Sequence, residues 1–187
     1  MLSVWQADLD RFVAELKIRR PSLIVKRGRF APVWLPSAWG SKPAAWAWFK
    51  TIVVADGALR HPAEVRRYLL AHELGHVAKG HSRRQAIALS VVLLCSAPGV
   101  FGAVHAAHLP LLVKLLWTTL FFAAALYFSW LTFTNAPEYE ADAVAVRLIG
   151  QGQVIYGILE MARLSGEGLT SKRKNRLRKL GVPPSTR

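Results

Sequence analysis

The stretch LLAHELGHVAKGH, residues 69–81, places two histidines and a glutamate within five positions. On an α-helix, residues four apart lie one above the other on the same face. His72 and His76 can therefore direct two imidazole rings at one metal ion, and Glu73 lies beside that ion. This spacing predicts a helix that carries a metal site.

The residue types indicate which chemistry such a site performs. Two histidines bind zinc, and the adjacent glutamate can take a proton from a zinc-bound water, as in the H-E-x-x-H arrangement of metallopeptidases. A helix with two partly exposed histidines is the alternative interpretation, because the five-residue pattern also occurs by chance. We predict His72 and His76 as zinc ligands and Glu73 as the catalytic base.

A second motif, PEYEAD at residues 137–142, supplies carboxylates. A catalytic zinc usually has a third protein ligand and keeps one position for water. Glu138 and Asp142 are four apart, so Glu138 can bind the zinc while Asp142 orients a zinc-bound histidine through its other ring nitrogen. A solvated acidic helix start is the alternative, but four of the 11 acids in a chain of net charge +14 lie in these two motifs. That clustering favours a cation site.

The chain is 52% hydrophobic despite its net charge of +14, and the apolar residues gather in its middle. Residues 86–104 carry no charge, and residues 109–133 carry only Lys114. Each segment has roughly the 20 residues that a membrane-spanning helix needs. We predict a two-helix transmembrane hairpin at residues 86–133, with Pro98 and Gly99 ending its first helix early. Two buried helices in a soluble all-α core are the alternative.

Basic residues flank the apolar middle on both sides, and the short loop between the two segments has none. By the positive-inside rule, both termini then face the cytoplasm of a multi-pass protein in the cell's inner (cytoplasmic) membrane. The C-terminal stretch at residues 171–187 has seven basic residues and no acid. In a membrane protein this favours contact with anionic lipid over nucleic acid, so no nucleic-acid partner is expected.

The rest of the pattern indicates an α+β fold in a single domain, residues 1–187, with the hairpin inserted. Apolar periodicity predicts an amphipathic helix at residues 3–18. Two short strands are expected around Gly28, and a third within residues 45–57. Further helices are expected to begin near residue 62 and to cover residues 137–148, 154–164 and 172–180.

Together, TIVVADGAL (51–59), EVRRYLLAHELGHVAKGH (64–81) and EYEADAVAVRLIG (138–150) resemble the HtpX-type and CAAX-prenyl-protease-type membrane zinc endopeptidases. These gluzincins pair H-E-x-x-H with a downstream E-x-x-x-D, and the resemblance covers roughly residues 50–150 in order. It implies a zincin-like, mostly helical catalytic domain with a small β-sheet and one Zn²⁺ per chain. The resemblance implies that zinc is bound by His72, His76 and Glu138. It also implies that Glu73 is the general base and that Asp142 orients a zinc-bound histidine.

The resemblance also implies that the strand Thr51–Val54 lies at the edge of the cleft and pairs with an extended substrate. The chain departs from the family in lacking membrane segments ahead of the first motif. It also lacks the histidine that the family places before an Arg-containing C-terminal helix and that is expected to stabilise the oxyanion. Arg176 or Tyr156 is the candidate to take that role.

The function predicted from the sequence is an integral-membrane zinc-dependent endopeptidase with a cytoplasm-facing site. It would hydrolyse peptide bonds of membrane-associated or misfolded polypeptides. A site-2-type intramembrane protease is disfavoured, because the late carboxylates follow the apolar segments instead of lying within them. A non-catalytic zinc-binding membrane adaptor of the same fold remains the alternative from a different class.

Overall fold

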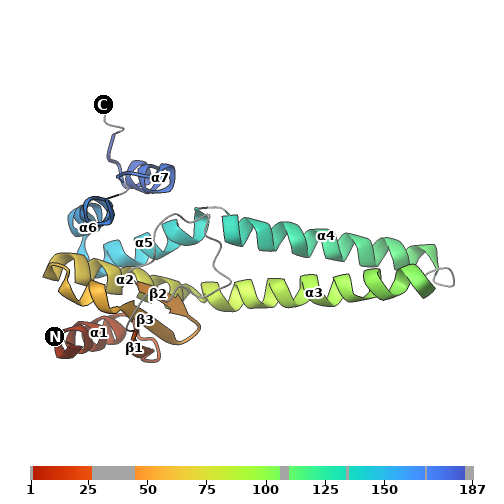
Figure 1. Cartoon of the computed structure of the whole chain (residues 1–187), viewed down its shortest axis with the longest axis horizontal. Helices are drawn as coiled ribbons and strands as arrows, with labels where there is room; N and C mark the ends of the chain where they lie inside the picture. The colour runs from red at the N-terminus through yellow and green to blue at the C-terminus, as the bar shows by residue number, and fades with distance from the viewer. Residues whose placement is uncertain (1, 27–44, 106–109, 134, 167, 184–187) are drawn as a thin grey trace. The chain divides into compact units, whose positions relative to one another are not determined.

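The computed structural model describes the backbone of residues 2–26, 45–105, 110–133, 135–166 and 168–183. It divides into two compact units, Met1–Gly80 with Pro137–Arg187, and His81–Ala136. The described chain is mostly helical with one small sheet, as predicted (Figure 1). Both sequence motifs lie in the first unit, so one compact body contains the candidate site.

The first unit takes its shape from six helices and three strands along the described chain. In order they are α1 (Leu2–Leu16), β1 (Ser22–Lys26), β2 (Ala45–Trp48), β3 (Thr51–Ala55), the short 3₁₀ helix η2 (Asp56–Arg60), α2 (Ala63–Lys79), α5 (Ala136–Ile149), α6 (Gln151–Ser165) and α7 (Ser171–Lys179).

The sheet has the order β1-β3-β2, with β3 parallel to β1 and antiparallel to β2. The β-branched run of β3 occupies its centre, where Ile52, Val53 and Val54 are buried. Because Thr51–Val54 is paired on both sides, the expectation that this strand pairs with substrate is wrong. On the side of β3 opposite β1, the described sheet ends at β2.

Residues 45–57 form two strands where the sequence predicted one. The hairpin between β2 and β3 turns at Phe49 and Lys50, with Phe49 in the left-handed conformation at φ 52°. Hairpin turns of this kind usually contain Gly or Asn. Because the turn residues are Phe and Lys, the sequence predicted one continuous strand within residues 45–57. The strand expected just after Gly28 lies outside the described residues.

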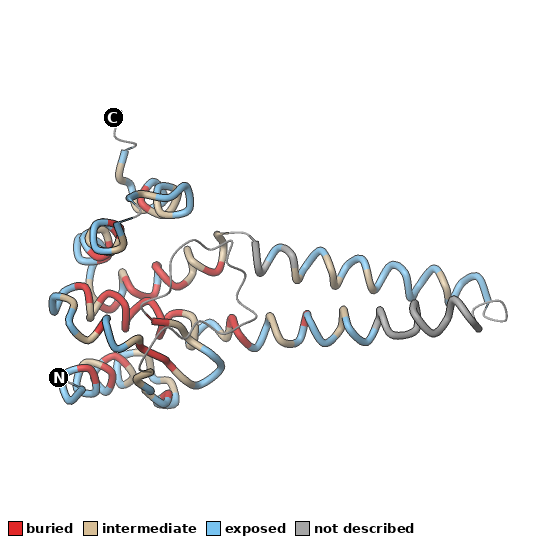
Figure 2. The backbone as a smooth tube through the Cα atoms, in the orientation of Figure 1, coloured by how far each residue is buried: buried red, intermediate tan, exposed pale blue. Residues whose placement is uncertain are grey.

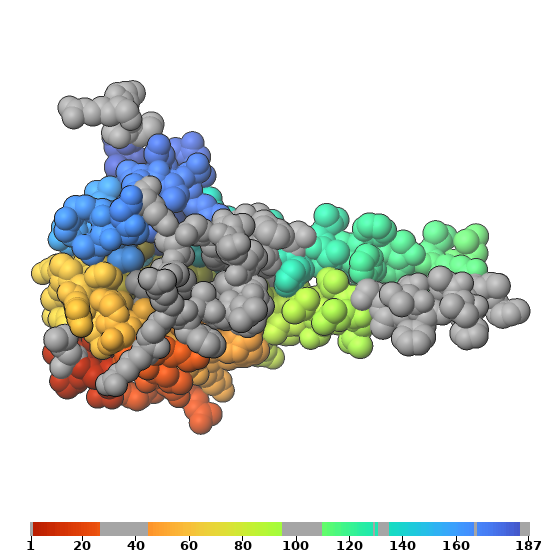
Figure 3. Space-filling model, in the orientation of Figure 1, coloured from red at the N-terminus to blue at the C-terminus, as the bar shows by residue number. Residues whose placement is uncertain are grey.

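Helix α2 lies at the centre of the first unit. Helix α1 packs on one side of it and α6 on the other, and β2 and β3 also contact it (Figure 3). Its middle is consequently buried around most of its circumference, which Figure 2 shows as a continuous red stretch. A helix enclosed in this way holds its side chains in fixed rotamers. The core residues that are almost or completely buried include Trp5, Leu9, Phe12, Ile52, Val54, Val65, Leu70, Leu74, Val154 and Ile158.

Helix α2 ends at Gly80, whose φ of 65° is left-handed and whose N–H donates to the carbonyl oxygens of His76 and Val77. Glycine suits this position because it has no Cβ to strain. The next helix begins at His81, so the helix with the metal motif is separate from the apolar helix that follows.

The second unit consists of α3 (His81–His105) and α4 (Leu111–Phe133), which run side by side in opposite directions (Figure 1). The helical backbone of α3 continues through Pro98, so the expected early end is wrong. Among the residues whose placement is described, only α4 is long and apolar enough to cross a membrane. Its window Leu111–Phe128 has a mean hydropathy of 1.8 and no buried residue. The structure thus matches one of the two predicted spans by length and composition.

Helices α2 and α5 cross at Gly75 with their backbones in contact. A Cβ placed on Gly75 would lie 2.6 Å from the carbonyl oxygen of Ala141 and 2.7 Å from its Cα. No side chain larger than hydrogen fits without moving one helix. This close crossing brings the carboxylates of α5 up to the histidines of α2.

We expect Gly75→Ala to push α5 away from α2, lowering the free energy of unfolding by about 1–3 kcal/mol and weakening metal binding. Gly152→Ala is the matched control, because a Cβ there meets nothing within 4 Å. Replacing this helical glycine should stabilise the protein by about 0.5–1 kcal/mol. Chemical denaturation and zinc titration of the detergent-purified proteins measure both effects. A Gly75→Ala protein with unchanged stability and zinc binding would contradict the close crossing.

Candidate metal centre

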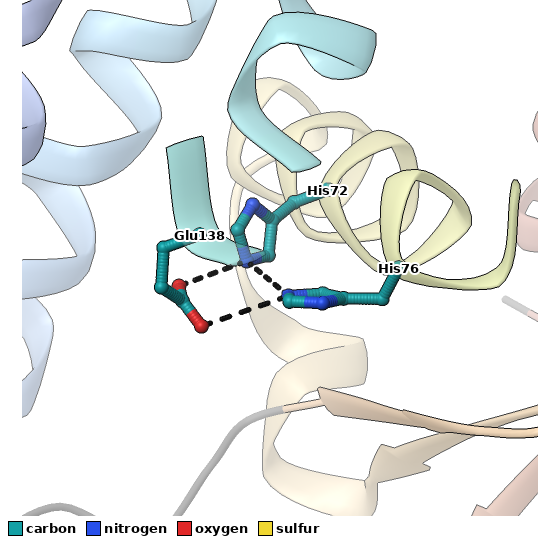
Figure 4. Close-up of side chains that lie close together, drawn as sticks. All are labelled: His72, His76 and Glu138. Carbon is teal, nitrogen blue, oxygen red and sulfur yellow. Dashed lines mark hydrogen bonds and ion pairs between the residues drawn. The ribbon is translucent and has the colours of Figure 1, made fainter. Parts of the chain in front are cut away.

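Three side chains from two helices point at one another (Figure 4). His72 and His76 project from α2 and Glu138 from the first turn of α5. The Nε2 atom of His72 lies 3.2 Å from Nε2 of His76 and 3.4 Å from Oε2 of Glu138, and Nε2 of His76 lies 3.7 Å from Oε1 of Glu138. The three ligand atoms all lie within 4.8 Å of one another, so the group can hold a metal ion.

The spacing of these atoms fits a small tetrahedral ion. Zinc binds histidine nitrogen and carboxylate oxygen at about 2.0–2.1 Å, which places neighbouring ligands of a tetrahedron about 3.3 Å apart. The two histidine nitrogens are 3.2 Å apart, close to that value, and each lies 3.4 or 3.7 Å from a different carboxylate oxygen of Glu138. Two imidazoles and one carboxylate also form a donor set that zinc favours, with one position left over.

The outer nitrogen of His72 faces Asp142. Its Nδ1 lies 2.9 Å from Oδ1 of Asp142, whose side chain is only 4% exposed. When Nε2 binds a metal, the ring proton must be on Nδ1 and is donated to this carboxylate. The arrangement therefore fixes both the orientation and the tautomer of His72.

Arg176, from the basic helix α7, reaches the same carboxylates. Its Nε and Nη2 donate to the two oxygens of Asp142 at 2.7 and 2.6 Å, and its Nη1 lies 3.0 Å from Oε2 of Glu138. Its guanidinium is thus engaged by the two acids, on the Nδ1 side of His72. Tyr156, the other residue considered for oxyanion stabilisation, is 45% exposed on α6 and takes part in none of the contacts described for this site.

Sequence reasoning missed Tyr68 and did not foresee the contacts of Arg176 with the acids. The Tyr68 hydroxyl accepts a hydrogen bond of 2.6 Å from Nη2 of Arg176. Tyr68 lies one helical turn before His72, which was the available signal. Arg176 is one of several bases in its stretch, and nothing in the local pattern distinguishes it from the others.

The charges of the site support one another. Burial by itself raises the pKa of Glu138, but the hydrogen bond from His72 and the charges of His72, Arg176 and His76 bring it well below its usual value. The pKa of Asp142 is lowered against burial by the same His72 and Arg176. Burial and Arg176 lower the pKa of His72, yet its hydrogen bonds to Asp142 and Glu138 raise it to about 9. Two ionised carboxylates thus face the imidazoles, which suits a cation.

Glu73 is buried beside the three ligand atoms. Its carboxylate accepts a hydrogen bond from the backbone of Ala47 in β2. Burial raises the pKa of Glu73 to about 7, with the charge of His72 opposing this rise and that of Glu138 adding to it. A carboxylate with a pKa near neutrality suits a group that takes up and returns a proton.

Comparison with known proteins gives one match. A family model described as peptidase family M48 matches residues 32–179, which include every residue of the site. Comparisons with curated proteins and with solved structures give no significant match.

The contacts of Asp142 and Arg176 predict that both residues support metal binding without touching the metal. We expect Asp142→Asn or Arg176→Gln to weaken zinc affinity about 10–100-fold, because His72 loses its orientation. Arg178→Gln is the control, since Arg178 is exposed on the same helix and the change removes the same charge. Competition with a chelating dye measures the affinity. Equal losses in the Arg176 and Arg178 variants would show a general charge effect instead.

Proposed function

Because the chain belongs to peptidase family M48 and is therefore a metallopeptidase acting on polypeptides, we propose that its metal is zinc. We further propose that it is an endopeptidase that cuts membrane-associated or misfolded proteins. The observation that carries this proposal is the placement of three zinc-type ligand side chains, whose ligand atoms lie within 4.8 Å of one another, beside the buried Glu73. A binding module needs the three ligands but has no need of a buried carboxylate next to them.

In the proposed mechanism, His72, His76 and Glu138 hold the zinc ion. When bound, zinc supplies Lewis acidity that polarises the scissile carbonyl and acidifies water. Glu73 accepts a proton from the attacking water while the water oxygen adds to the carbonyl carbon. Glu73 then gives this proton to the amide nitrogen as the carbon–nitrogen bond breaks. The products are a carboxylic acid and an amine, and proton exchange between them leaves a carboxylate and an ammonium group.

The neighbouring residues keep these groups in place. The Ala47 backbone hydrogen bond orients the carboxylate of Glu73, and Asp142 holds the Nδ1 proton of His72. Arg176 in turn fixes both oxygens of Asp142. Such orientation lowers the barrier because the reacting groups start close to their productive geometry.

We propose that an extended substrate lies along β2, in place of the β3 strand expected from the sequence. Strand β2 stands at the end of the described sheet, and its Ala47 contacts Glu73 directly. A polypeptide aligned with β2 would therefore have its scissile bond beside the base. Backbone pairing of this kind depends little on side chains, which suits unfolded substrates of varied sequence.

We propose that α4 crosses the membrane and that α3 provides the second span of a hairpin, with both termini cytoplasmic. The support is the exposure of large apolar residues along α4, a band that a water-soluble unit rarely presents. The most exposed of these include Leu111, Leu112, Leu116, Phe122 and Leu126. Lys114, near the beginning of α4, can reach the headgroup region.

Glu73→Gln should retain zinc but lose cleavage of an unfolded casein-type substrate by roughly 10²–10⁴-fold, because the amide cannot accept the proton. A chelator should abolish cleavage by the wild type, and added zinc should restore it. The assay uses the full chain purified in detergent, with zinc content measured on the same samples. A wild type that holds one zinc and cuts no polypeptide would favour the non-catalytic adaptor.

Leu120→Arg tests the membrane proposal, since Leu120 is exposed and lies near the middle of the apolar window. A charge there costs about 2.5–3.5 kcal/mol on insertion scales. We expect less of this variant than of the wild type in the carbonate-resistant membrane fraction. Leu164→Arg, at an exposed leucine of α6, is the control and should fractionate like the wild type. Complete release of the wild type by carbonate would contradict a transmembrane α4.

A further inference from the structure

Tyr68 occupies a buried position directly behind the metal site. It precedes His72 by one turn of α2, its exposure is 4%, and the centroids of the two rings lie 5.8 Å apart. Its hydroxyl oxygen accepts the 2.6 Å hydrogen bond from Nη2 of Arg176. Burial raises the pKa of Tyr68, with the nearby carboxylates adding to this effect and Arg176 opposing it. The hydroxyl is therefore neutral and available as an acceptor.

The ring of Tyr68 packs against the neighbouring helix at a glycine, where no side chain stands in its way. A Cβ placed on Gly157 of α6 would overlap Cβ, Cγ and Cδ1 of Tyr68. Glycine at this position leaves the room that the Tyr68 side chain occupies. The direction of the hydroxyl is consequently set by packing on α6 and does not depend on its hydrogen bond alone.

The hydrogens of Arg176 explain what this hydroxyl does. Nη2 carries two hydrogens and has three described neighbours: Oδ1 of Asp142 at 2.6 Å, the Tyr68 hydroxyl at 2.6 Å and Nδ1 of His72 at 3.3 Å. In the tautomer that binds metal through Nε2, Nδ1 carries a proton and cannot accept from Arg176. The two hydrogens of Nη2 are then accepted by Asp142 and Tyr68.

Removing the Tyr68 oxygen would leave one Nη2 hydrogen facing His72. Nδ1 of His72 lies 3.3 Å from Nη2 and can accept that hydrogen when it is unprotonated, which moves the ring proton to Nε2, where the metal should bind. A buried donor without an acceptor is costly, so the two arrangements of the His72 proton compete.

We propose that Tyr68 is a positioning residue that acts through Arg176 to hold His72 in its metal-binding tautomer. The inference rests on the proposed role of His72 as a zinc ligand. The Tyr68 hydroxyl contacts Arg176, which is not one of the three candidate ligands. It should therefore influence zinc affinity and turnover while leaving substrate binding unchanged.

The test is Tyr68→Phe, which removes the hydroxyl and keeps the ring against Gly157. In the detergent-purified full chain we expect zinc affinity to fall about tenfold by chelator competition. With zinc in excess, kcat should fall while KM stays the same. Tyr127→Phe is the control, because it deletes a hydroxyl from an exposed tyrosine of α4 that has no part in the site. Unchanged zinc affinity in Tyr68→Phe, together with an unchanged kcat, would overturn the proposal.

A double-mutant cycle separates positioning from a structural role. If Tyr68 acts through Arg176, Tyr68→Phe should have little further effect on zinc affinity in an Arg176→Gln background. Fully additive losses would overturn the proposal, as would a lower thermal midpoint of metal-free Tyr68→Phe without any change in zinc affinity. A wild type that binds zinc but cuts nothing would overturn the peptidase function alone. The zinc affinities of the variants would still decide the role of Tyr68.

Discussion

The site depends on one steric constraint, the contact of α2 and α5 at Gly75. The H-E-x-x-H helix carries two of the candidate ligands and the candidate base, but the third candidate ligand and the partner of His72 come from a helix more than 60 residues later in the chain. A Cβ at position 75 would lie only 2.6 Å from the carbonyl oxygen of Ala141, so the two backbones leave no room for a side chain there. Glu138 and Asp142, which flank Ala141 on α5, thereby reach both nitrogens of one imidazole.

Around this crossing, the polar groups form a layered arrangement in which each layer orients the next. Asp142 orients His72, Arg176 orients Asp142, and the Tyr68 hydroxyl accepts from Arg176. Each link is short and at least partly buried, where a hydrogen bond is electrostatically stronger than in water and an unpaired group is costly. The helix α7 therefore belongs to the metal site although it carries no ligand atom. A basic C-terminal stretch that resembles a lipid-binding tail in sequence also supplies a structural part of the centre.

The extent to which sequence could predict this structure follows the range of the interactions involved. Most helices were recognised because the period of their apolar residues is local, and the close pairing of His72 and His76 follows from helix geometry alone. The strands and their order in the sheet were predicted less accurately. The hairpin at Phe49 has no Gly or Asn to mark it, and strand order depends on which strands meet in space, so β3 was assigned the place that β2 occupies. The proline in α3 was given too much weight, since the helical backbone continues through Pro98.

The sequence by itself determined the chemical composition of the centre: two histidines and a glutamate on one helix, two carboxylates one turn apart on another, and an apolar segment between them. The spacing of these residues along a helix decides which of them share a face, and this does not depend on what packs against the helix. Only the tertiary structure decided that Arg176, among several bases in its stretch, meets the acids, that Tyr68 meets Arg176, and that β2 contacts Glu73. These contacts join residues up to 108 positions apart. They form in a fold in which α2 packs against the backbone of α5 at Gly75 and the Tyr68 side chain packs against Gly157.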